Sequence, residues 1–64
     1  MYVARDRDGD LYLYKKKPVK YSERWQSVGV YSRDYFKLDA SLFPEVSWED
    51  EEPTEVELVK TQKV

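Results

Sequence analysis

The side chains best suited to binding chemistry in this chain are aromatic and basic residues that alternate over residues 12–25. The set comprises Tyr12, Tyr14, Lys15, Lys16, Lys17, Tyr21, Arg24 and Trp25. Aromatic rings beside a cationic groove are typical of a surface that binds single-stranded nucleic acid. Alternatively, Trp25 and some of the tyrosines belong to the core, and the lysines protect an edge strand from aggregation. The net charge of −2 argues against general affinity for nucleic acid.

A second concentration of charge is the acidic run from Glu45 to Glu57. Residues 1–37 carry nine Lys/Arg and five Asp/Glu, whereas residues 38–64 carry two Lys and eight Asp/Glu. Carboxylates on a rigid surface can mimic phosphates and steer a basic partner protein toward the chain. Alternatively, the run is a solvated loop and strand, and the basic and acidic halves of the chain partly neutralise each other.

The composition excludes several kinds of active site. The chain has no cysteine and no histidine, which excludes Ser-His and Cys-His nucleophiles, imidazole acid–base catalysis and the usual zinc sites. Gly9 and Gly29 are the only glycines, so a glycine-rich phosphate loop is absent. We therefore expect a protein that is not an enzyme and that holds no cofactor.

One short motif resembles the start of a calcium-binding loop. It consists of Asp6, Asp8 and Asp10 at alternate positions. A calcium loop needs glycine at its sixth position and glutamate at its twelfth, where this chain has Leu11 and Lys17. We therefore expect no metal site and interpret the motif as a turn.

The elements that position these residues begin with a β-hairpin over residues 1–17. Asp8-Gly9 is a strong signal for a two-residue turn, because such turns need positive φ angles. That turn pairs Ala4 with Leu13 and Val3 with Tyr14. It predicts one face, taken as the core face, made of Tyr2, Ala4, Leu11 and Leu13, and an opposite, half-exposed face made of Val3, Arg5, Tyr12 and Tyr14.

Three further strands are predicted along the chain. They cover residues 24–31, 35–38 and 54–63, and residues 15–22 are predicted to be a connector. Phe36 and Leu38 alternate with Tyr35 and Lys37 in the middle strand of the three. These segments show the two-residue alternation of strands, and no segment shows a sustained helical period.

Residues 39–43 are predicted to form one short helical turn. Asp39 would accept the free amides that follow it, and Pro44 would end the turn because it disfavours a helical conformation at Phe43. Leu42, Phe43 and Val46 would then close one end of the sheet. The following residues, from Trp48 to Pro53, are predicted to be acidic and exposed.

The expected fold class is mainly β. It is a small antiparallel sheet of about five strands, able to curl into a partly open barrel, with one short helical turn near 39–43. Residues 1–64 are expected to form a single small β domain. No apolar run approaches the ~20 residues of a membrane span, and no leader peptide is recognisable, so we expect a cytoplasmic protein without a membrane partner.

Several stretches of the chain carry a resemblance. They are residues 3–14 (VARDRDGDLYLY), Lys17-Pro18, Trp25 and residues 42–53 (LFPEVSWEDEEP). The chain resembles small uncharacterised proteins encoded by phages, prophages and mobile elements of gut bacteria. No established activity accompanies this resemblance. It implies a viral, non-enzymatic accessory protein with an anti-defence or host-takeover role, acting in the host-cell cytoplasm.

The expected function is binding and inhibition of a host defence or nucleic-acid-processing protein through a surface face. The alternative is a β domain that sequesters a small ligand or nucleotide, or binds single-stranded nucleic acid. Homo-oligomer formation would favour that alternative, because tiny domains usually need a subunit interface to make a concave site. The candidate binding residues are Arg5, Tyr12, Tyr14, Lys16 and Trp25 on the basic–aromatic side and Trp48, Glu49, Asp50 and Glu51 on the acidic side.

Overall fold

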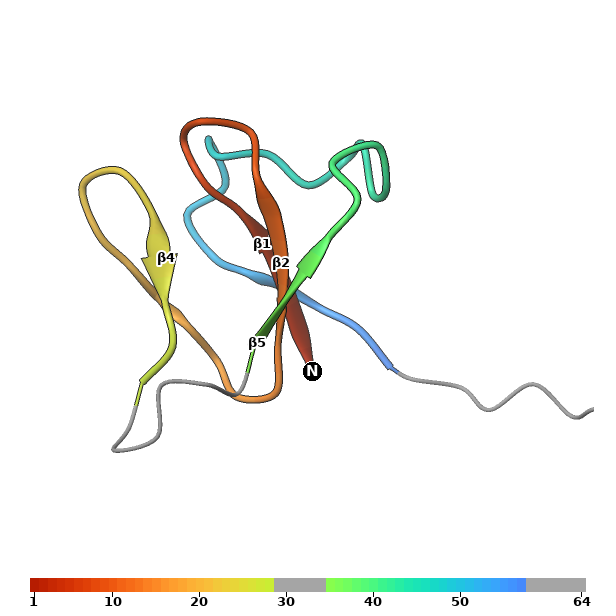
Figure 1. Ribbon diagram of the computed structural model, residues 1–64. Helices are drawn as coiled ribbons and strands as arrows, with labels where there is room; N and C mark the ends of the chain where they lie inside the picture. The colour runs from red at the N-terminus through yellow and green to blue at the C-terminus, as the bar shows by residue number, and fades with distance from the viewer. Residues whose placement is uncertain (29–34, 58–64) are drawn as a thin grey trace, which may run out of the picture.

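The computed structural model describes residues 1–28 and 35–57, and within these residues the chain is mainly β and contains no helix. The described strands are β1 (Tyr2–Arg5), β2 (Leu11–Tyr14), β3 (Val19–Lys20), β4 (Trp25–Gln26), β5 (Tyr35–Leu38) and β6 (Thr54–Glu55). Figure 1 shows their arrangement. The predicted fold class is therefore confirmed.

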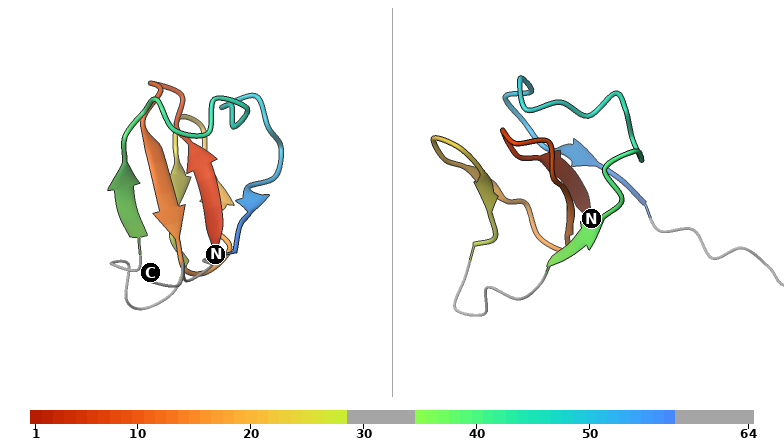
Figure 2. Two further views of the ribbon diagram at one scale, coloured as in Figure 1. Left: turned by 90° about the vertical axis from the view of Figure 1, so that its right-hand side faces the viewer. Right: turned by 45° about the horizontal axis from the view of Figure 1, so that its top comes forward.

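The strands form two small antiparallel sheets. The larger sheet has the strand order β5-β2-β1-β6, and β3 and β4 pair with each other as a separate hairpin. The left view of Figure 2 looks onto the four-stranded sheet, with the β3–β4 hairpin behind it. The described strands do not close into a barrel.

The β1–β2 hairpin forms as predicted, but its loop holds three residues instead of two. Asp6 and Asp10 close the loop, since the Asp6 N–H donates to the Asp10 carbonyl oxygen at 2.8 Å. Gly9 adopts a φ of +99°, a conformation that costs glycine little because it has no Cβ. A three-residue loop with glycine at its end is a common hairpin connection. The predicted two-residue turn was therefore wrong.

The longer loop shifts the pairing of β1 and β2 by one residue. Ala4 lies opposite Tyr12, and Val3 lies opposite Leu13. One face of the pair consequently carries Val3, Arg5, Leu11 and Leu13, and the other carries Tyr2, Ala4, Tyr12 and Tyr14. The predicted division into a leucine core face and a Tyr/Arg face was wrong, because a one-residue slip moves one strand's side chains relative to the other's.

Each face of the four-stranded sheet has its own small core. On one face, Val3 and Leu11 are completely buried against Val46. On the other face, Tyr14 and Trp25 are buried with Ala4, and the β3–β4 hairpin supplies the covering Trp25. The tyrosine face is therefore largely covered, whereas the sequence predicted it to be half exposed.

β3 lies in the segment 15–22 that was predicted to be a connector, so this prediction was wrong, whereas β4 lies within the strand predicted over 24–31. Side chains of the larger sheet hold the β3–β4 hairpin in place. The backbone N–H of Trp25 donates to Asp6 Oδ1 at 2.8 Å, and the Tyr14 hydroxyl donates to the backbone carbonyl oxygen of Trp25 at 3.3 Å. The Arg7 N–H donates to the Glu23 carbonyl oxygen at 3.1 Å. These bonds join two sheets that share no strand.

The predictions for the remaining strands have different outcomes. β5 covers the predicted residues, and its pairing with β2 places Phe36 and Leu38 on one face and Tyr35 and Lys37 on the other. The strand predicted over 24–31 is described only as β4, and the strand predicted over 54–63 only as β6. The remainder of these two predictions lies partly in residues 29–31 and 58–63, which are outside the described residues.

The segment after β5 forms hydrogen-bonded turns, and the predicted helical turn near 39–43 was wrong. The Leu42 N–H donates to the Asp39 carbonyl oxygen at 3.0 Å, which closes a single turn. Phe43 has a φ of +47°, in agreement with the expectation that Pro44 disfavours helical conformation before it. Of the three residues expected to close the sheet, only Val46 is buried; Leu42 and Phe43 remain 47% and 36% exposed.

No helix that is long and apolar enough to cross a membrane occurs within residues 1–28 and 35–57.

Candidate functional site

Two features of the structure could bind a partner or a ligand. The first is the segment from Asp39 to Pro53, which connects β5 to β6 without regular secondary structure and which we call the acidic loop. It carries six Asp/Glu and no Lys/Arg. The second is a hollow on the tyrosine side of the larger sheet, which we call the tyrosine pocket. The views of Figures 1 and 2 show the loop running past one end of the sheet.

Arg5, the last residue of β1, anchors the first half of the acidic loop. Each of its five guanidinium N–H groups donates to a backbone carbonyl oxygen, at distances from 2.7 to 3.2 Å. The acceptors belong to Gly9, Ala40, Leu42, Phe43 and Val46. A planar guanidinium with five donors suits this task, because it can bond several carbonyls that converge on one point. The hydrogen-bonding capacity of Arg5 is fully used within the fold.

Lys20 anchors the second half of the loop from the β3–β4 hairpin. Its Nζ donates to the carbonyl oxygens of Trp48 at 2.6 Å and Asp50 at 2.9 Å. The same ammonium lies 4.2 Å from the centre of the Trp48 ring and 5.7 Å from that of Trp25. Cations at these distances from an indole are stabilised by its electron-rich face. Trp48 is therefore half-buried and structural, whereas the sequence placed it in an exposed stretch.

Local hydrogen bonds shape the turns of the acidic loop. The Ser47 N–H donates to Asp50 Oδ2 at 3.0 Å, and the Glu49 N–H donates to Ser47 Oγ at 3.1 Å. Asp39 Oδ1 accepts both the N–H and the hydroxyl of Ser41, and these bonds lower the pKa of Asp39. Asp39 thus caps a turn, as predicted, although the turn is not helical. Side chains with such local bonds are typical of rigid turns.

The acidic side chains that point away from these contacts form the outer surface of the loop. Glu45, Glu49 and Glu51 are exposed, and the carboxylates of these residues form no hydrogen bond or ion pair with a described residue. Glu52 forms an exposed ion pair with Lys17 at 2.9 Å, which raises the pKa of Lys17. The loop therefore presents unpaired carboxylates on a backbone whose carbonyl oxygens are bonded by Arg5 and Lys20.

Phe43 was not among the sequence-predicted site residues. It is a non-glycine residue with a φ of +47°, in the left-handed region that costs most side chains free energy. The carbonyl oxygen of Phe43 accepts bonds from Arg5 Nη2 at 3.2 Å and from the Val46 N–H at 2.9 Å. Strained backbone held by its surroundings tends to occur at functional sites. The following proline disfavours right-handed helix at Phe43 but favours extended backbone, so it did not predict this positive φ.

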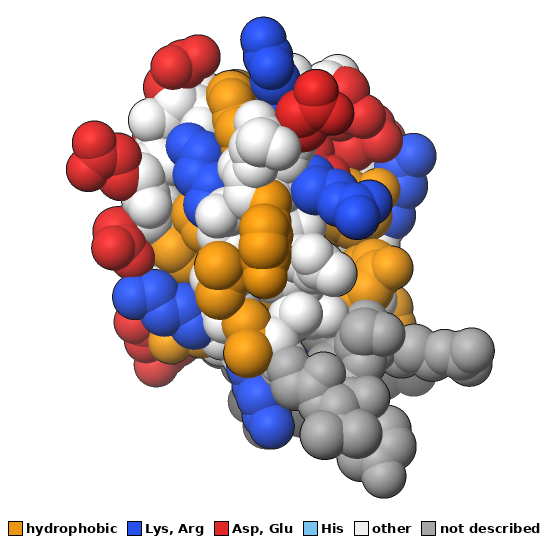
Figure 3. Space-filling view, turned by 90° about the vertical axis from the view of Figure 1, so that its left-hand side faces the viewer, with side chains coloured by type: hydrophobic (Ala, Val, Ile, Leu, Met, Phe, Trp, Pro, Cys, Tyr) orange, Lys and Arg blue, Asp and Glu red, His pale blue; other side chains and the backbone are white. Residues whose placement is uncertain are grey.

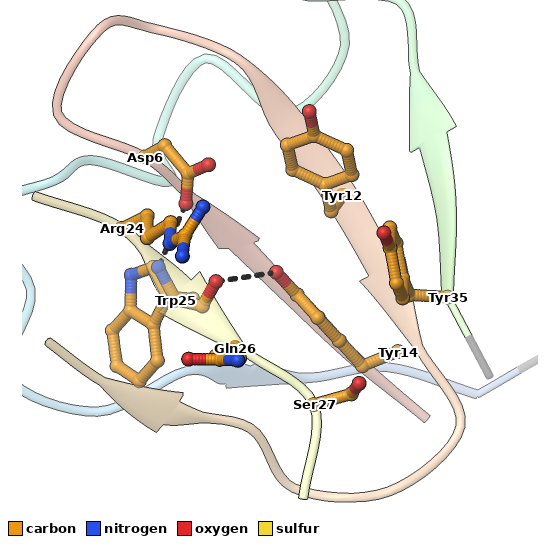
Figure 4. Close-up of a pocket in the computed structure, with 8 residues that line it drawn as sticks. All are labelled: Asp6, Tyr12, Tyr14, Arg24, Trp25, Gln26, Ser27 and Tyr35. Carbon is orange, nitrogen blue, oxygen red and sulfur yellow. Dashed lines mark hydrogen bonds between the residues drawn. The ribbon is translucent and has the colours of Figure 1, made fainter. Parts of the chain in front are cut away.

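The tyrosine pocket lies between β2, β5 and the β3–β4 hairpin and has a volume of about 230 Å³ (Figure 4). Its aromatic wall consists of Tyr12, Tyr14 and Tyr35. The ring centres of these tyrosines lie 5.7 to 6.3 Å apart, which is the range of favourable ring–ring contact. Trp25, Gln26 and Ser27 of the hairpin form the facing wall.

The charged groups of the tyrosine pocket are Asp6 and Arg24. Burial raises the pKa of Asp6; the Trp25 N–H bond and the charge of Arg24 lower it, and the charges of Asp8 and Asp10 raise it further. Burial likewise raises the pKa of Tyr12, with a further contribution from Asp10. The hydrogen bond from Trp25 and the charge of Arg24 thus do not fully offset the cost of burying the Asp6 carboxylate.

The structure brings together some of the sequence-predicted site residues and separates others. Tyr12, Tyr14 and Trp25 meet in the tyrosine pocket, together with Arg24 from the same predicted platform. Arg5 lies on the other face of the sheet, beneath the acidic loop. Lys16 is exposed and does not line the pocket.

The β3–β4 hairpin also exposes apolar side chains on its outer side. Val19 and Tyr21 are 43% and 55% exposed. Figure 3, viewed from this side, shows hydrophobic side chains in the middle of the face with charged side chains around them. Scattered exposed apolar groups of this size are normal on a small protein and do not by themselves define a site.

No group of three or more acidic side chains within the described residues is arranged to hold a metal ion. In the motif that resembles a calcium loop, Asp8 Oδ1 accepts the N–H of Asp10 at 3.1 Å, as expected in a turn. No protein-family model, curated protein sequence or solved structure matches this chain.

Proposed function

We propose that this chain is a non-enzymatic accessory protein of the phage type, which binds and inhibits a host protein that processes nucleic acid. The acidic loop is the binding surface, and the partner contributes a basic, nucleic-acid-binding surface. The proposed place of action is the cytoplasm of the host cell.

The observation that carries this proposal is the anchoring of the acidic loop by Arg5 and Lys20. Arg5 and Lys20 donate to carbonyl oxygens of the loop and not to its carboxylates. The carboxylates of Glu45, Glu49 and Glu51 therefore stay exposed and unpaired among the described residues. Structureless loops of about 12–15 residues or more are uncommon in compact domains and are usually functional or disordered. A pre-ordered loop binds with a smaller entropic cost than one that must order on binding.

Exposed apolar side chains in the same loop add support. Leu42 and Phe43 lie outside the core although they are large and apolar. Apolar groups rimmed by charge are typical of protein-binding surfaces, in which the apolar part supplies affinity and the charges supply steering. A basic protein surface complements this combination better than a nucleic acid does, because nucleic acid would be repelled by the carboxylates.

The direct test is capture of a partner from bacterial lysate, followed by competition with DNA. We expect the captured protein to bind nucleic acid, and we expect single-stranded or duplex DNA to displace it because both ligands use one basic surface. Binding should weaken steeply as salt is raised. A captured partner that binds this chain and DNA at the same time, with its activity unchanged, would contradict the proposal.

Reversing the charge of glutamates in the acidic loop tests whether this loop is the partner-binding surface. We expect the double variant Glu49→Lys/Glu51→Lys to abolish partner binding. The matched control is Glu23→Lys/Glu57→Lys, which changes the net charge equally at exposed residues outside the acidic loop. Binding that is lost equally in both variants would assign the interaction to net charge and not to this loop.

Phe43→Gly separates binding from folding. Glycine adopts positive φ without strain, so we expect the variant to be more stable by about 1 kcal/mol in urea unfolding. We expect it to bind the partner more weakly, since the exposed ring is lost. A variant that is stabilised but binds as tightly as the parent would remove Phe43 from the surface.

A further inference from the structure

The tyrosine pocket is a site separate from the acidic loop, and its two ends differ in chemistry. Figure 4 shows the Tyr12 and Tyr35 rings on one side and Asp6 and Arg24 next to each other on the other. The Tyr12 and Tyr35 rings lie 5.7 Å apart at 72°. Tyr35 is 44% exposed, and exposed aromatic rings stack on planar bases.

Asp6 and Arg24 have unused hydrogen-bonding capacity. Asp6 Oδ1 accepts the Trp25 N–H, and no described residue donates to Asp6 Oδ2. The guanidinium of Arg24 makes no hydrogen bond or ion pair within 4.0 Å to any described residue, and Arg24 is exposed. An acceptor and a forked donor therefore stand side by side in front of aromatic rings.

Guanine matches this pair of groups better than the other bases. Its N1–H and exocyclic amino group donate next to O6 and N7, which accept. A carboxylate can accept from the two donors, while an arginine fork bonds O6 and N7, the commonest specific contact of arginine with a base. Adenine offers one donating group beside its acceptors, and uracil a single N–H, so each would donate to the Asp6 carboxylate from one group where guanine donates from two.

We propose that the tyrosine pocket binds a guanine base, which stacks on the ring of Tyr35 with the ring of Tyr12 against its edge, donates to the carboxylate of Asp6 and accepts from the guanidinium of Arg24. The pocket volume of about 230 Å³ is below the usual range for drug-sized ligands, which suits one base and leaves the sugar and phosphate in solvent. The raised pKa of Asp6 agrees with a carboxylate that gains from a donating ligand.

The primary test is a calorimetric titration of the full chain with guanosine, adenosine and uridine monophosphates. We expect guanosine monophosphate to bind about tenfold more tightly than the other two, because only guanine of the three offers two donors to the carboxylate and two acceptors to the guanidinium. Guanosine without phosphate should bind within a few-fold of the nucleotide. Equal binding of the three nucleotides, no binding of any, or full competition by inorganic phosphate would each overturn the proposal.

A second arm identifies the source of the base. A short single-stranded oligonucleotide with one guanine is compared with the free nucleotide and with the same oligonucleotide carrying adenine instead. Tighter binding of the guanine oligonucleotide than of the free nucleotide assigns the site to single strands, and the reverse assigns it to nucleotides. Both results support guanine recognition, whereas equal binding of the two oligonucleotides overturns it.

Variants of the two charged residues test the assigned roles. Asp6→Asn keeps an oxygen that can accept the backbone N–H of Trp25, so the fold should persist. The variant should nevertheless bind guanosine monophosphate about tenfold more weakly. Arg24→Gln should have a similar effect, and Arg7→Gln, at another exposed arginine, should have none. Retention of guanine preference in both Asp6→Asn and Arg24→Gln would overturn the proposal.

The stacking role is tested in the same way, and independently of the proposed function. Tyr35→Leu should weaken binding, whereas Tyr21→Leu, at an exposed tyrosine outside this pocket, should not. The charge-reversal variant Glu49→Lys/Glu51→Lys should bind guanosine monophosphate normally. The two proposals can therefore fail separately, because loss of partner binding leaves the guanine site unaffected.

Discussion

At the scale of single residues, Arg5 is the most informative side chain of the chain. The sequence placed it on a basic–aromatic binding face, whereas the structure gives it five bonds to carbonyl oxygens of the hairpin loop and the acidic loop. The bonds to the Val46 and Gly9 carbonyl oxygens are partly buried, where an unpaired polar group costs about 1–3 kcal/mol, and the bonds to Ala40, Leu42 and Phe43 are exposed. Arg5 supplies these carbonyls with partners where no strand does.

Replacing Arg5 tests this structural role. A lysine has three donors at a single point and cannot bond five carbonyls, so we expect Arg5→Lys to lower the free energy of unfolding by about 2–4 kcal/mol. Urea unfolding followed by tryptophan fluorescence measures the change. Arg7→Lys, at an exposed residue of the hairpin loop, is the control and should change stability by less than about 0.5 kcal/mol. An equal effect of both variants would contradict the anchoring role.

Tyr14 predicts a pH dependence. It is 3% exposed, and burial raises its pKa well above the usual range for tyrosine. Folding therefore favours the neutral phenol. This contribution is complete below about pH 10, the pKa of tyrosine in the unfolded chain, and is lost as the pH rises toward the folded pKa, by up to about 1.4 kcal/mol per pH unit.

The variant Tyr14→Phe should make this alkaline loss shallower. It should also cost about 1 kcal/mol near neutral pH, because the bond from the hydroxyl to the Trp25 carbonyl oxygen disappears. Urea unfolding across the alkaline range measures both effects. An unchanged slope above about pH 10 would show that the titration of another tyrosine dominates.

At the scale of elements, the hairpin loop determines which side chains share a face. Asp8-Gly9 correctly indicated a turn, but short-range sequence cannot distinguish a two-residue from a three-residue loop when both accept glycine. The structure resolves this with Gly9 at a φ of +99°. One additional loop residue was enough to move Tyr12 and Tyr14 onto the face of Ala4.

Gly9→Ala tests the loop. A Cβ at this position meets no atom within 4 Å, so its cost is conformational and not steric crowding. We expect a loss of about 1–2 kcal/mol in urea unfolding. The mirror-image residue, D-alanine, introduced by chemical synthesis, should be tolerated because it prefers positive φ. Equal destabilisation by both enantiomers would contradict a conformational origin.

β3 and its pairing with β4 were missed because the signals for them are tertiary, although β4 lies within the strand predicted over 24–31. β3 and β4 have two residues each, too few for a recognisable alternation, and Pro18 precedes β3 directly. The pair is held by Asp6, Tyr14 and Lys20, whose partners lie 11 to 30 residues away in the sequence. β5, by contrast, was predicted with its observed bounds, since its four residues alternate in the sequence. In the structure these residues pair along the whole of β2.

At the scale of the whole molecule, a sheet covered on both faces divides a small amount of apolar surface between two cores. Val3, Leu11 and Val46 form one buried cluster, and Ala4, Tyr14 and Trp25 form the other. A domain of this size rarely gains more than about 3–5 kcal/mol from its hydrophobic core. Each core should therefore be essential.

Leu11→Ala tests this dependence. Leu11 is completely buried, and removal of such a leucine costs about 2.7–5 kcal/mol. We expect loss of cooperative unfolding and of resolved NMR signals for residues of both clusters. Phe36→Ala, at a residue 57% exposed, is the control and should leave the spectrum intact. Loss of signals confined to the Val3 cluster would show that the two cores fold independently.

The sequence by itself determined the fold class, the hairpin, the strand at residues 35–38 and the separation of charge along the chain. These properties depend on local alternation, turn residues and composition, and all of them can be read over a few neighbouring positions. The absence of cysteine and histidine belongs to the same group, because it limits chemistry whatever the fold.

Only the tertiary structure decided the role of each candidate residue. Arg5 and Lys20 became anchors and Trp48 became a structural contact, whereas Tyr12, Tyr14 and Trp25 met in one pocket. The physical reason is that an arginine, a lysine or a tryptophan can bind a partner or hold its own chain with the same groups. Which of these it does depends on whether backbone carbonyls or rings from distant residues lie within reach.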